Sequence, residues 1–188
     1  MPPSFFEQQV GLNCAAHAIN NYFQEEILPC AELNIVRNWI RQVYSADRNG
    51  TYDAHFRDDG FFSVPTLLRY VSEHFGHNVP TILGSRPPMP AAQALAILRD
   101  NTRIISSRNN RAYSHSVAAI RGEGGYWYLL DSEASGPSRR LSAENLLNRL
   151  TGIIYADNRP NELPSIDTSE VIEIDSKMSI CSLHRFVR

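Results

Sequence analysis

Cysteines, net charge and long apolar runs are all scarce in this sequence of 188 residues. The three cysteines lie far apart without a C-x-x-C pair, which argues against a zinc knuckle or a thioredoxin-like motif and suits reduced thiols. The formal net charge is −2 and no polybasic stripe is present, so we expect neither nucleic acid nor a charged membrane surface as a partner. No apolar stretch approaches the roughly 20 residues that a membrane span requires.

The amino terminus contains no basic region followed by an apolar one, because Met1 to Ser4 lead directly into an aromatic and glutamine-rich segment. With sparse cysteines, this pattern predicts a cytoplasmic or nuclear protein, or one that another cell exports into a host cytosol. The length and the 43% content of hydrophobic residues predict a single core. We expect a monomer with one domain over residues 1–158 and a polar tail over residues 159–188.

Helical patterns dominate the first half of the chain. Alanine-rich sequence follows Asn13, which is expected to cap a helix that continues to Phe23. Apolar residues at spacings of three and four predict a second helix over residues 29–43. A third helix is predicted over residues 63–75, and the second and third helices together would form a helical arm.

The second half of the chain has the patterns of strands. Runs typical of strands occupy residues 79–83, 103–107, 114–121, 126–131 and 152–156, with a glycine-rich hairpin loop at 122–125. Short helices are predicted at 91–98 and after the potential cap Ser142, and residues 171–174 could add an edge strand. Helices followed by antiparallel strands predict an α+β fold.

Four residues have the chemistry and the chain order of a thiol hydrolase site. Cys14, at the start of the first helix, lies where the helix dipole and free backbone N–H groups favour a thiolate. His115 opens one strand and Asp131 closes the next, so the hairpin would place an imidazole beside a carboxylate. Gln9 precedes the cysteine in a loop constrained by Gly11, from which its side-chain amide could reach an oxyanion next to the sulfur.

Each of these residues also has a purely structural interpretation. A cysteine at a helix start is commonly a small buried hydrophobic residue, a histidine on a strand is commonly a polar core residue, and Asp131 could begin a turn. Their joint order, glutamine and cysteine followed by a distant histidine and aspartate, favours a papain-like arrangement. His17 lies one helical turn after Cys14, but we predict a packing role for it because a residue on the nucleophile's own helix is poorly placed to act as an independently oriented base.

Three segments resemble Josephin-domain deubiquitinases, and the resemblance covers residues 5–156. Residues 6–21 closely resemble the amino-terminal motif of that family, in which a glutamine, a glycine, the catalytic cysteine, a histidine and paired asparagines recur at these offsets. Residues 58–63 are similar to its acidic-Gly-Phe-Phe-Ser segment. His115 and residues 126–132 are similar to its catalytic histidine and to an aromatic strand that ends in asparagine or aspartate followed by serine.

The resemblance implies a papain-like α+β fold of the Josephin type, with an amino-terminal catalytic helix, a helical arm and a carboxy-terminal antiparallel sheet. It implies cleavage of isopeptide or peptide bonds after the C-terminus of ubiquitin or polyubiquitin, through a thioester and without a metal ion or organic cofactor. Position by position, Cys14 matches the nucleophile, His115 the general base, Asp131 the orienting residue and Gln9 the oxyanion donor. Ser116 departs from the pattern, since a bulky aromatic residue usually follows the histidine.

Two other functions are compatible with the same residues. A glutamine deamidase or a transglutaminase can use cysteine, histidine and aspartate in this order for acyl transfer from glutamine. A non-catalytic ubiquitin-binding module could also retain all four residues as a vestigial site. Release of ammonia from a protein glutamine would favour the first, and failure to react with a ubiquitin vinyl electrophile would favour the second.

Overall fold

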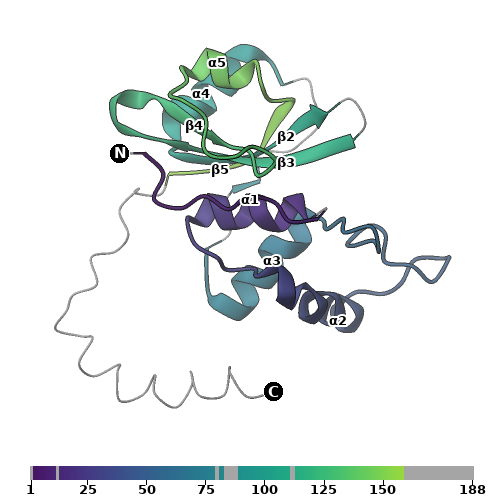
Figure 1. Cartoon of the computed structure of the whole chain (residues 1–188). Helices are drawn as coiled ribbons and strands as arrows, with labels where there is room; N and C mark the ends of the chain where they lie inside the picture. The colour runs from purple at the N-terminus through teal and green to yellow at the C-terminus, as the bar shows by residue number, and fades with distance from the viewer. Residues whose placement is uncertain (1, 12, 79–80, 83–88, 111–112, 159–188) are drawn as a thin grey trace, which may run out of the picture.

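The computed structural model describes residues 2–11, 13–78, 81–82, 89–110 and 113–158, and its first three α-helices precede an antiparallel sheet (Figure 1). This arrangement confirms the predicted α+β class. The predicted tail, with its possible strand at 171–174, lies outside the described residues. The elements in chain order are α1 (Cys14–Phe23), η1 (Cys30–Glu32), α2 (Leu33–Val43), α3 (Val64–Phe75), β1 (Thr81–Ile82), α4 (Ala91–Asp100), β2 (Arg103–Asn110), β3 (Tyr113–Arg121), η2 (Glu123–Gly125), β4 (Trp127–Leu130), α5 (Ala143–Leu147) and β5 (Gly152–Asp157).

The described sheet has five strands in the order β1-β5-β2-β3-β4, and every neighbouring pair is antiparallel. Helices α4 and α5 cover one face of the sheet, whereas α1 lies on the other face with α3 and α2 beyond it (Figure 1). Each face therefore has its own hydrophobic core. Within the described residues, no helix combines the length and the apolar character that crossing a membrane requires.

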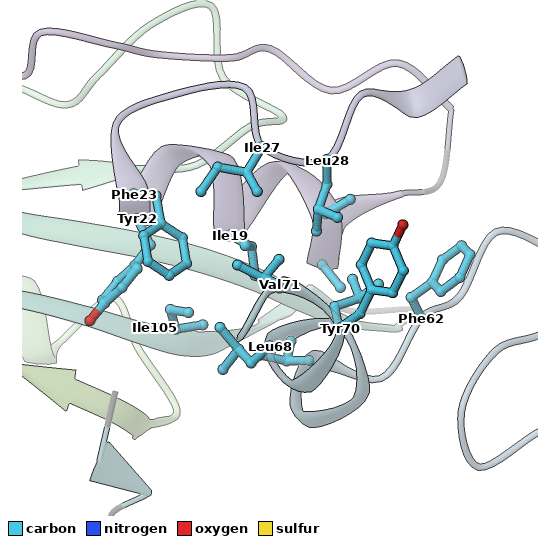
Figure 2. Packing of buried hydrophobic residues seen from close by; sticks show 14 of the residues in the cluster. Ile19, Tyr22, Phe23, Ile27, Leu28, Phe62, Leu68, Tyr70, Val71 and Ile105 are labelled. Atoms are coloured by element: carbon cyan, nitrogen blue, oxygen red, sulfur yellow. The ribbon is translucent and has the colours of Figure 1, made fainter. Parts of the chain in front are cut away.

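The larger core lies between the sheet, α1 and the helical arm. Ile19 of α1, Leu68 and Val71 of α3 and Ile105 of β2 belong to one cluster, and their side chains are almost inaccessible to solvent (Figure 2). The arm predicted over residues 29–75 is present as α2 and α3, whose apolar faces close this core. Small side chains let α1 approach β3 closely, and those buried in α1 are Ala15, Ala16 and Ala18.

Two helix starts differ in how they are capped. Asn13 precedes α1 as predicted, but its side chain makes no capping hydrogen bond, so that part of the prediction is wrong. Its backbone is not in the extended conformation of a capping residue, and its Nδ2 lies 3.9 Å from the Cys30 sulfur instead. Ser142 does cap α5, because its hydroxyl oxygen accepts a hydrogen bond from the backbone N–H of Asn145.

Three elements end later than predicted, and one of them, β5, continues by one residue to Asp157. β2 continues past residue 107 to Asn110, because its ladder with β3 continues as far as the pair of Asn110 and Tyr113. α4 continues past residue 98 to Asp100. The predicted hairpin loop at 122–125 contains the short helix η2 and joins β3 to β4 as expected. Long-range ladder partners, which local sequence does not reveal, account for the longer strand.

Helix α1 is fixed to the sheet at its carboxy-terminal end. Arg103, a buried residue of β2, donates hydrogen bonds from Nη1 to the backbone oxygens of Tyr22 and Phe23, at 2.9 and 3.2 Å. The Tyr22 hydroxyl also donates to the carboxylate of Asp157, in β5, at 3.3 Å. A cation at this end satisfies carbonyl groups that lack partners within the helix, and it complements the helix dipole. The sheet thereby determines where the opposite end of α1 lies.

Arg103→Met should destabilise the protein, because it leaves the last carbonyl groups of α1 buried without a charged donor. Hydrogen bonds to charged groups contribute about 1.5 to 3 kcal/mol, so we expect a loss of about 2 kcal/mol in the free energy of unfolding, measured by urea denaturation. Arg99→Met, at an exposed position of α4, is the matched control and should change stability by less than about 0.5 kcal/mol. Equal effects of the two substitutions would contradict this role of Arg103.

Candidate active site

Cys14, His115 and Asp131 come together from three separate elements. Cys14 is the first residue of α1, His115 lies near the start of β3, and Asp131 follows the last residue of β4. Pairing of these strands sets Ala118 opposite Leu130, so Asp131 lies diagonally across from His115. The imidazole Nε2 and the carboxylate Oδ1 are 2.8 Å apart, and both side chains are buried. The strand register thus pairs the predicted imidazole with the predicted carboxylate.

The Cys14 thiol and the His115 imidazole perturb each other in the direction of an ion pair. Burial by itself raises the pKa of Cys14, but hydrogen bonding to His115 and to the backbone and hydroxyl of Ser116 outweighs it, so the pKa falls below its ordinary value. Burial lowers the pKa of His115, but hydrogen bonds to Asp131 and Cys14 outweigh it and raise the pKa to about 9. Both shifts therefore favour a thiolate beside an imidazolium over the neutral pair.

The imidazole of His115 presents one nitrogen to the carboxylate and leaves the other for the thiol. Because Nε2 is hydrogen-bonded to Asp131, Nδ1 is the atom that remains for Cys14. Nδ1 is buried and makes no hydrogen bond of standard geometry within the described residues, and Glu133 Oε1 lies 3.8 Å from it. The thiol and the imidazole thus interact without ideal alignment, as is common in hydrolases before substrate binds.

Three hydrogen-bond donors hold the carboxylate of Asp131. Besides His115, the backbone N–H of Glu133 donates to Oδ1 at 3.1 Å, and Arg108 Nη1 donates to Oδ2 at 2.6 Å. Burial raises the pKa of Asp131, but these donors outweigh it and lower the pKa to about 2. Asp131 is therefore ionised throughout the neutral range, with both oxygens engaged.

Gln9 lies at the corner where β4 ends. Its backbone N–H donates to the Ser132 carbonyl at 2.7 Å, and its side-chain Oε1 accepts from the Ser132 hydroxyl at 3.1 Å. Its Nε2 donates at 2.6 Å to the carbonyl of Gly11, which has a φ of +71° that favours glycine. An amide NH₂ carries two N–H bonds, so one remains for an incoming oxygen. The structure therefore holds Gln9 beside the residue that follows Asp131.

A buried polar stripe on α1 holds the segment that carries Gln9. Glu7 is bound by several members of the stripe: Asn21 Oδ1 accepts from its backbone N–H at 2.7 Å, Asn21 Nδ2 donates to its carbonyl at 3.2 Å, and Asn20 Nδ2 donates to its Oε2 at 2.7 Å. Further along, Gln24 Oε1 accepts from the backbone N–H of Phe5 at 3.2 Å. Spacings of three and four residues put all members of the stripe on one side of the helix. The stripe consists of His17, Asn20, Asn21 and Gln24.

His17 has both ring nitrogens engaged with the amino-terminal half of the chain. Its Nδ1 lies 2.9 Å from Glu7 Oε2, while its Nε2 accepts a hydrogen bond from the Val10 backbone N–H at 3.2 Å and lies 3.4 Å from Cys30 Sγ. A nitrogen that accepts from a backbone N–H carries no proton, so the ring proton belongs on Nδ1, facing the carboxylate. These contacts agree with the packing role predicted for His17.

Four further residues contact the predicted site residues, although the sequence alone indicated no role for them at the site. The sequence marks Ser116 only as a departure from the Josephin pattern, yet it hydrogen-bonds the Cys14 sulfur. Arg108 could have been found from the strand register, which sets it opposite His115 once β2 and β3 are aligned. The four residues are Arg108, Ser116, Ser132 and Glu133.

The described residues bring together one group of potential metal ligands, formed by His115, Asp131 and Glu133. His115 and Asp131 are hydrogen-bonded to each other, and Arg108 places a cation against the same carboxylate. Because a metal ion would compete with these partners for the same lone pairs, the arrangement favours an imidazolium and carboxylate pair.

Comparison of the sequence with models of known protein families gives no match, and comparison with curated proteins gives none either. The functional assignment therefore depends on the arrangement of the site and on the resemblance of its motifs. Both concern the same residues, Cys14, His115, Asp131 and Gln9, and both can be tested chemically.

Alkylation by iodoacetamide should begin at a lower pH at Cys14 than at Cys30. Against the effect of its own burial, Cys14 has a lowered pKa because of His115 and Ser116, whereas burial and the nearby Glu7 carboxylate raise the pKa of Cys30. Because the thiolate is the reactive form, rates measured for each cysteine by mass spectrometry between about pH 5 and pH 10 report the two midpoints.

The same measurement on His115→Ala supplies the control. The substitution removes the imidazolium, which persists up to about pH 9, so the Cys14 midpoint should move upward while the Cys30 midpoint stays in place. Coincident midpoints for Cys14 and Cys30 in the unsubstituted protein would show that the thiol is not activated.

Proposed function

We propose that this chain is a cysteine-dependent deubiquitinase with a papain-like fold of the Josephin type. The observation that carries the proposal is the interaction of the Cys14 thiol with an imidazole, His115, that Asp131 orients. Gln9, bound to Ser132 at the same corner, supports it. The resemblance of residues 6–21 to the Josephin motif suggests the substrate, ubiquitin or polyubiquitin, which the arrangement of four side chains does not specify.

In the first half-reaction, the Cys14 thiolate attacks the carbonyl carbon at the C-terminus of ubiquitin, so a C–S bond forms and the carbonyl oxygen becomes an oxyanion. The Gln9 side-chain amide and the Cys14 backbone N–H donate hydrogen bonds to that oxygen. The His115 imidazolium then gives its proton to the leaving amine as the C–N bond breaks. A thioester and a neutral imidazole remain.

In the second half-reaction, His115 accepts a proton from a water molecule whose oxygen attacks the thioester carbon. The C–S bond breaks and restores the thiolate and imidazolium, and the carboxylic acid of ubiquitin that is released loses the second proton of the water to solvent. Asp131 remains ionised throughout, because its pKa of about 2 lies far below the working range, and its hydrogen bond holds the ring in one orientation.

The route of the substrate follows from the elements around Cys14. The diglycine end of ubiquitin suits a channel too narrow for larger side chains, between the start of α1 and the start of β3. Ser116 replaces the bulky aromatic residue of the Josephin pattern at this point, which widens one wall of the channel and supplies a hydroxyl to the sulfur. The helical arm, α2 and α3, would close over the bound tail. A reducing cytosol or nucleus would keep the thiol active.

Cys14→Ala should abolish cleavage of a ubiquitin-fluorophore conjugate, because no other group in the proposed mechanism can form the thioester. The fluorescence assay is combined with circular dichroism, which should show an unchanged fold. Cys30→Ala is the matched control and should retain most of the activity. Undiminished turnover by Cys14→Ala would refute the assignment.

A ubiquitin probe with a C-terminal vinyl electrophile tests the substrate separately from the thiol. The unsubstituted protein should form a covalent adduct visible on a denaturing gel, and Cys14→Ala should form none. Ammonia release from a protein glutamine without adduct formation would instead identify a glutamine acyltransferase built on the same three residues.

Gln9→Leu should lower kcat much more than it changes KM, because the amide is expected to bind the oxyanion and not the ground-state carbonyl. Loss of one oxyanion donor typically lowers kcat by about 10² to 10³-fold, measured here with the ubiquitin-fluorophore substrate. Gln8→Leu, one residue away and exposed, is the control and should be nearly neutral. Equal activities of the two variants would remove Gln9 from the mechanism.

A further inference from the structure

The carboxylate of Asp131 has a charged partner that the proposed mechanism does not use. Arg108 lies on β2 directly opposite His115 in the strand register. Its Nη1 donates to Asp131 Oδ2 at 2.6 Å, and its side chain is 49% exposed whereas that of Asp131 is 8% exposed. The guanidinium therefore covers the solvent side of the carboxylate while His115 occupies the buried side.

We propose that Arg108 is a positioning residue of the triad and that its presence requires aspartate, not asparagine, at position 131. The inference rests on the proposed roles of Cys14 and His115. It explains a choice that the motif leaves open, since the Josephin pattern allows either residue before the serine. The reason is the number of hydrogen-bond donors that face the side chain of residue 131.

Three N–H donors converge on the side chain of residue 131. His115 Nε2 and the backbone N–H of Glu133 address Oδ1, and Arg108 Nη1 addresses Oδ2. A carboxylate is an acceptor at both oxygens and satisfies all three donors. An amide has one acceptor and one donor group, so in either orientation its NH₂ would face an N–H group at close range.

The contact between Arg108 and Asp131 also affects the net charge near the Cys14 sulfur. Thiolate, imidazolium, carboxylate and guanidinium alternate in sign from Cys14 to Arg108, and the Glu133 carboxylate lies 3.8 Å from His115 Nδ1 as a further negative charge. The pair of Asp131 and Arg108 itself adds no net charge near the sulfur. Without the guanidinium, an uncompensated carboxylate would remain near the thiolate and disfavour it. Arg108 thereby lets a charged residue orient His115 without opposing the ionisation of Cys14.

A double-mutant cycle tests whether the three hydrogen-bond donors around residue 131 require a carboxylate there. Asp131→Asn alone should lower kcat/KM for the ubiquitin-fluorophore substrate by about a hundredfold, and Arg108→Gln alone by about tenfold, because each disturbs the orientation of the general base. Independent effects would multiply in the double variant. We expect instead that Arg108→Gln/Asp131→Asn is about tenfold more active than Asp131→Asn, since the glutamine oxygen can accept from the asparagine NH₂.

A second readout does not require deubiquitinase activity. The pH midpoint of Cys14 alkylation should rise in Arg108→Gln and stay unchanged in Arg108→Lys, which keeps the charge. Arg99→Gln, on α4, is the control and should leave both activity and midpoint unaltered. Thermal unfolding of each variant verifies that it is folded.

Two results would overturn the inference. One is an alkylation midpoint that does not move in a folded Arg108→Gln variant. The other is a double variant that is no more active than Asp131→Asn. If the chain cleaves no ubiquitin substrate at all, the alkylation midpoints still decide the role of Arg108, so failure of the proposed function and failure of this inference are distinguishable.

Discussion

Helix α1 is held at its carboxy-terminal end and along the side that faces β3. The candidate site at its amino-terminal end forms only when both of these contacts are made. Arg103 and Tyr22 fix its carboxy-terminal end to the sheet, and its buried alanines set how closely it approaches β3. Cys14 at its other end then meets a strand about a hundred residues later in the chain. A shift of one helical turn is about 5.4 Å, which exceeds any hydrogen-bond distance and would separate the thiol from His115.

The polar stripe of α1 extends the same constraint to Gln9, the proposed oxyanion donor. Buried polar side chains require partners, and those of the stripe find several of theirs in the backbone and carboxylate of residues 4–10. Ser132 holds Gln9 from the opposite side. The segment before Cys14 is therefore a tightly bonded part of the site although it has neither helix nor strand, and its order depends on long-range contacts with both α1 and the end of β4.

Local sequence predicts those parts of the molecule that depend on local patterns. The helix around Ile19 follows from its alanine-rich sequence and the helix around Val36 from apolar spacing, and the pairing of His115 with Asp131 follows from two strands joined by a short hairpin. The capping role expected of Asn13 is not found in the structure. Its amide instead faces the sulfur of Cys30, which the next loop brings near.

Contacts between residues distant in the chain are also absent from local patterns. Arg108 could be linked to the site only after β2 was aligned with β3, and the polar stripe of α1 reads in the sequence as ordinary helix surface. Such contacts are decided by tertiary packing, which overrides local preference.

Two cysteines in the described part of the chain lie beside an imidazole, and their different chemistry shows what activates a thiol. Cys30 lies 3.4 Å from His17 Nε2, but that nitrogen accepts a hydrogen bond from the Val10 backbone N–H and so has no proton to donate to the sulfur. Burial and the Glu7 carboxylate raise the pKa of Cys30.

The imidazole beside Cys14 is in the opposite state. Its Nε2 is bound to Asp131, which favours the protonated ring and places an N–H on the side of the sulfur. An N–H stabilises a thiolate, so the pKa of Cys14 falls although burial opposes it. Proximity of a cysteine and a histidine is thus insufficient for a nucleophile, and the residue behind the histidine decides which of the two thiols is activated.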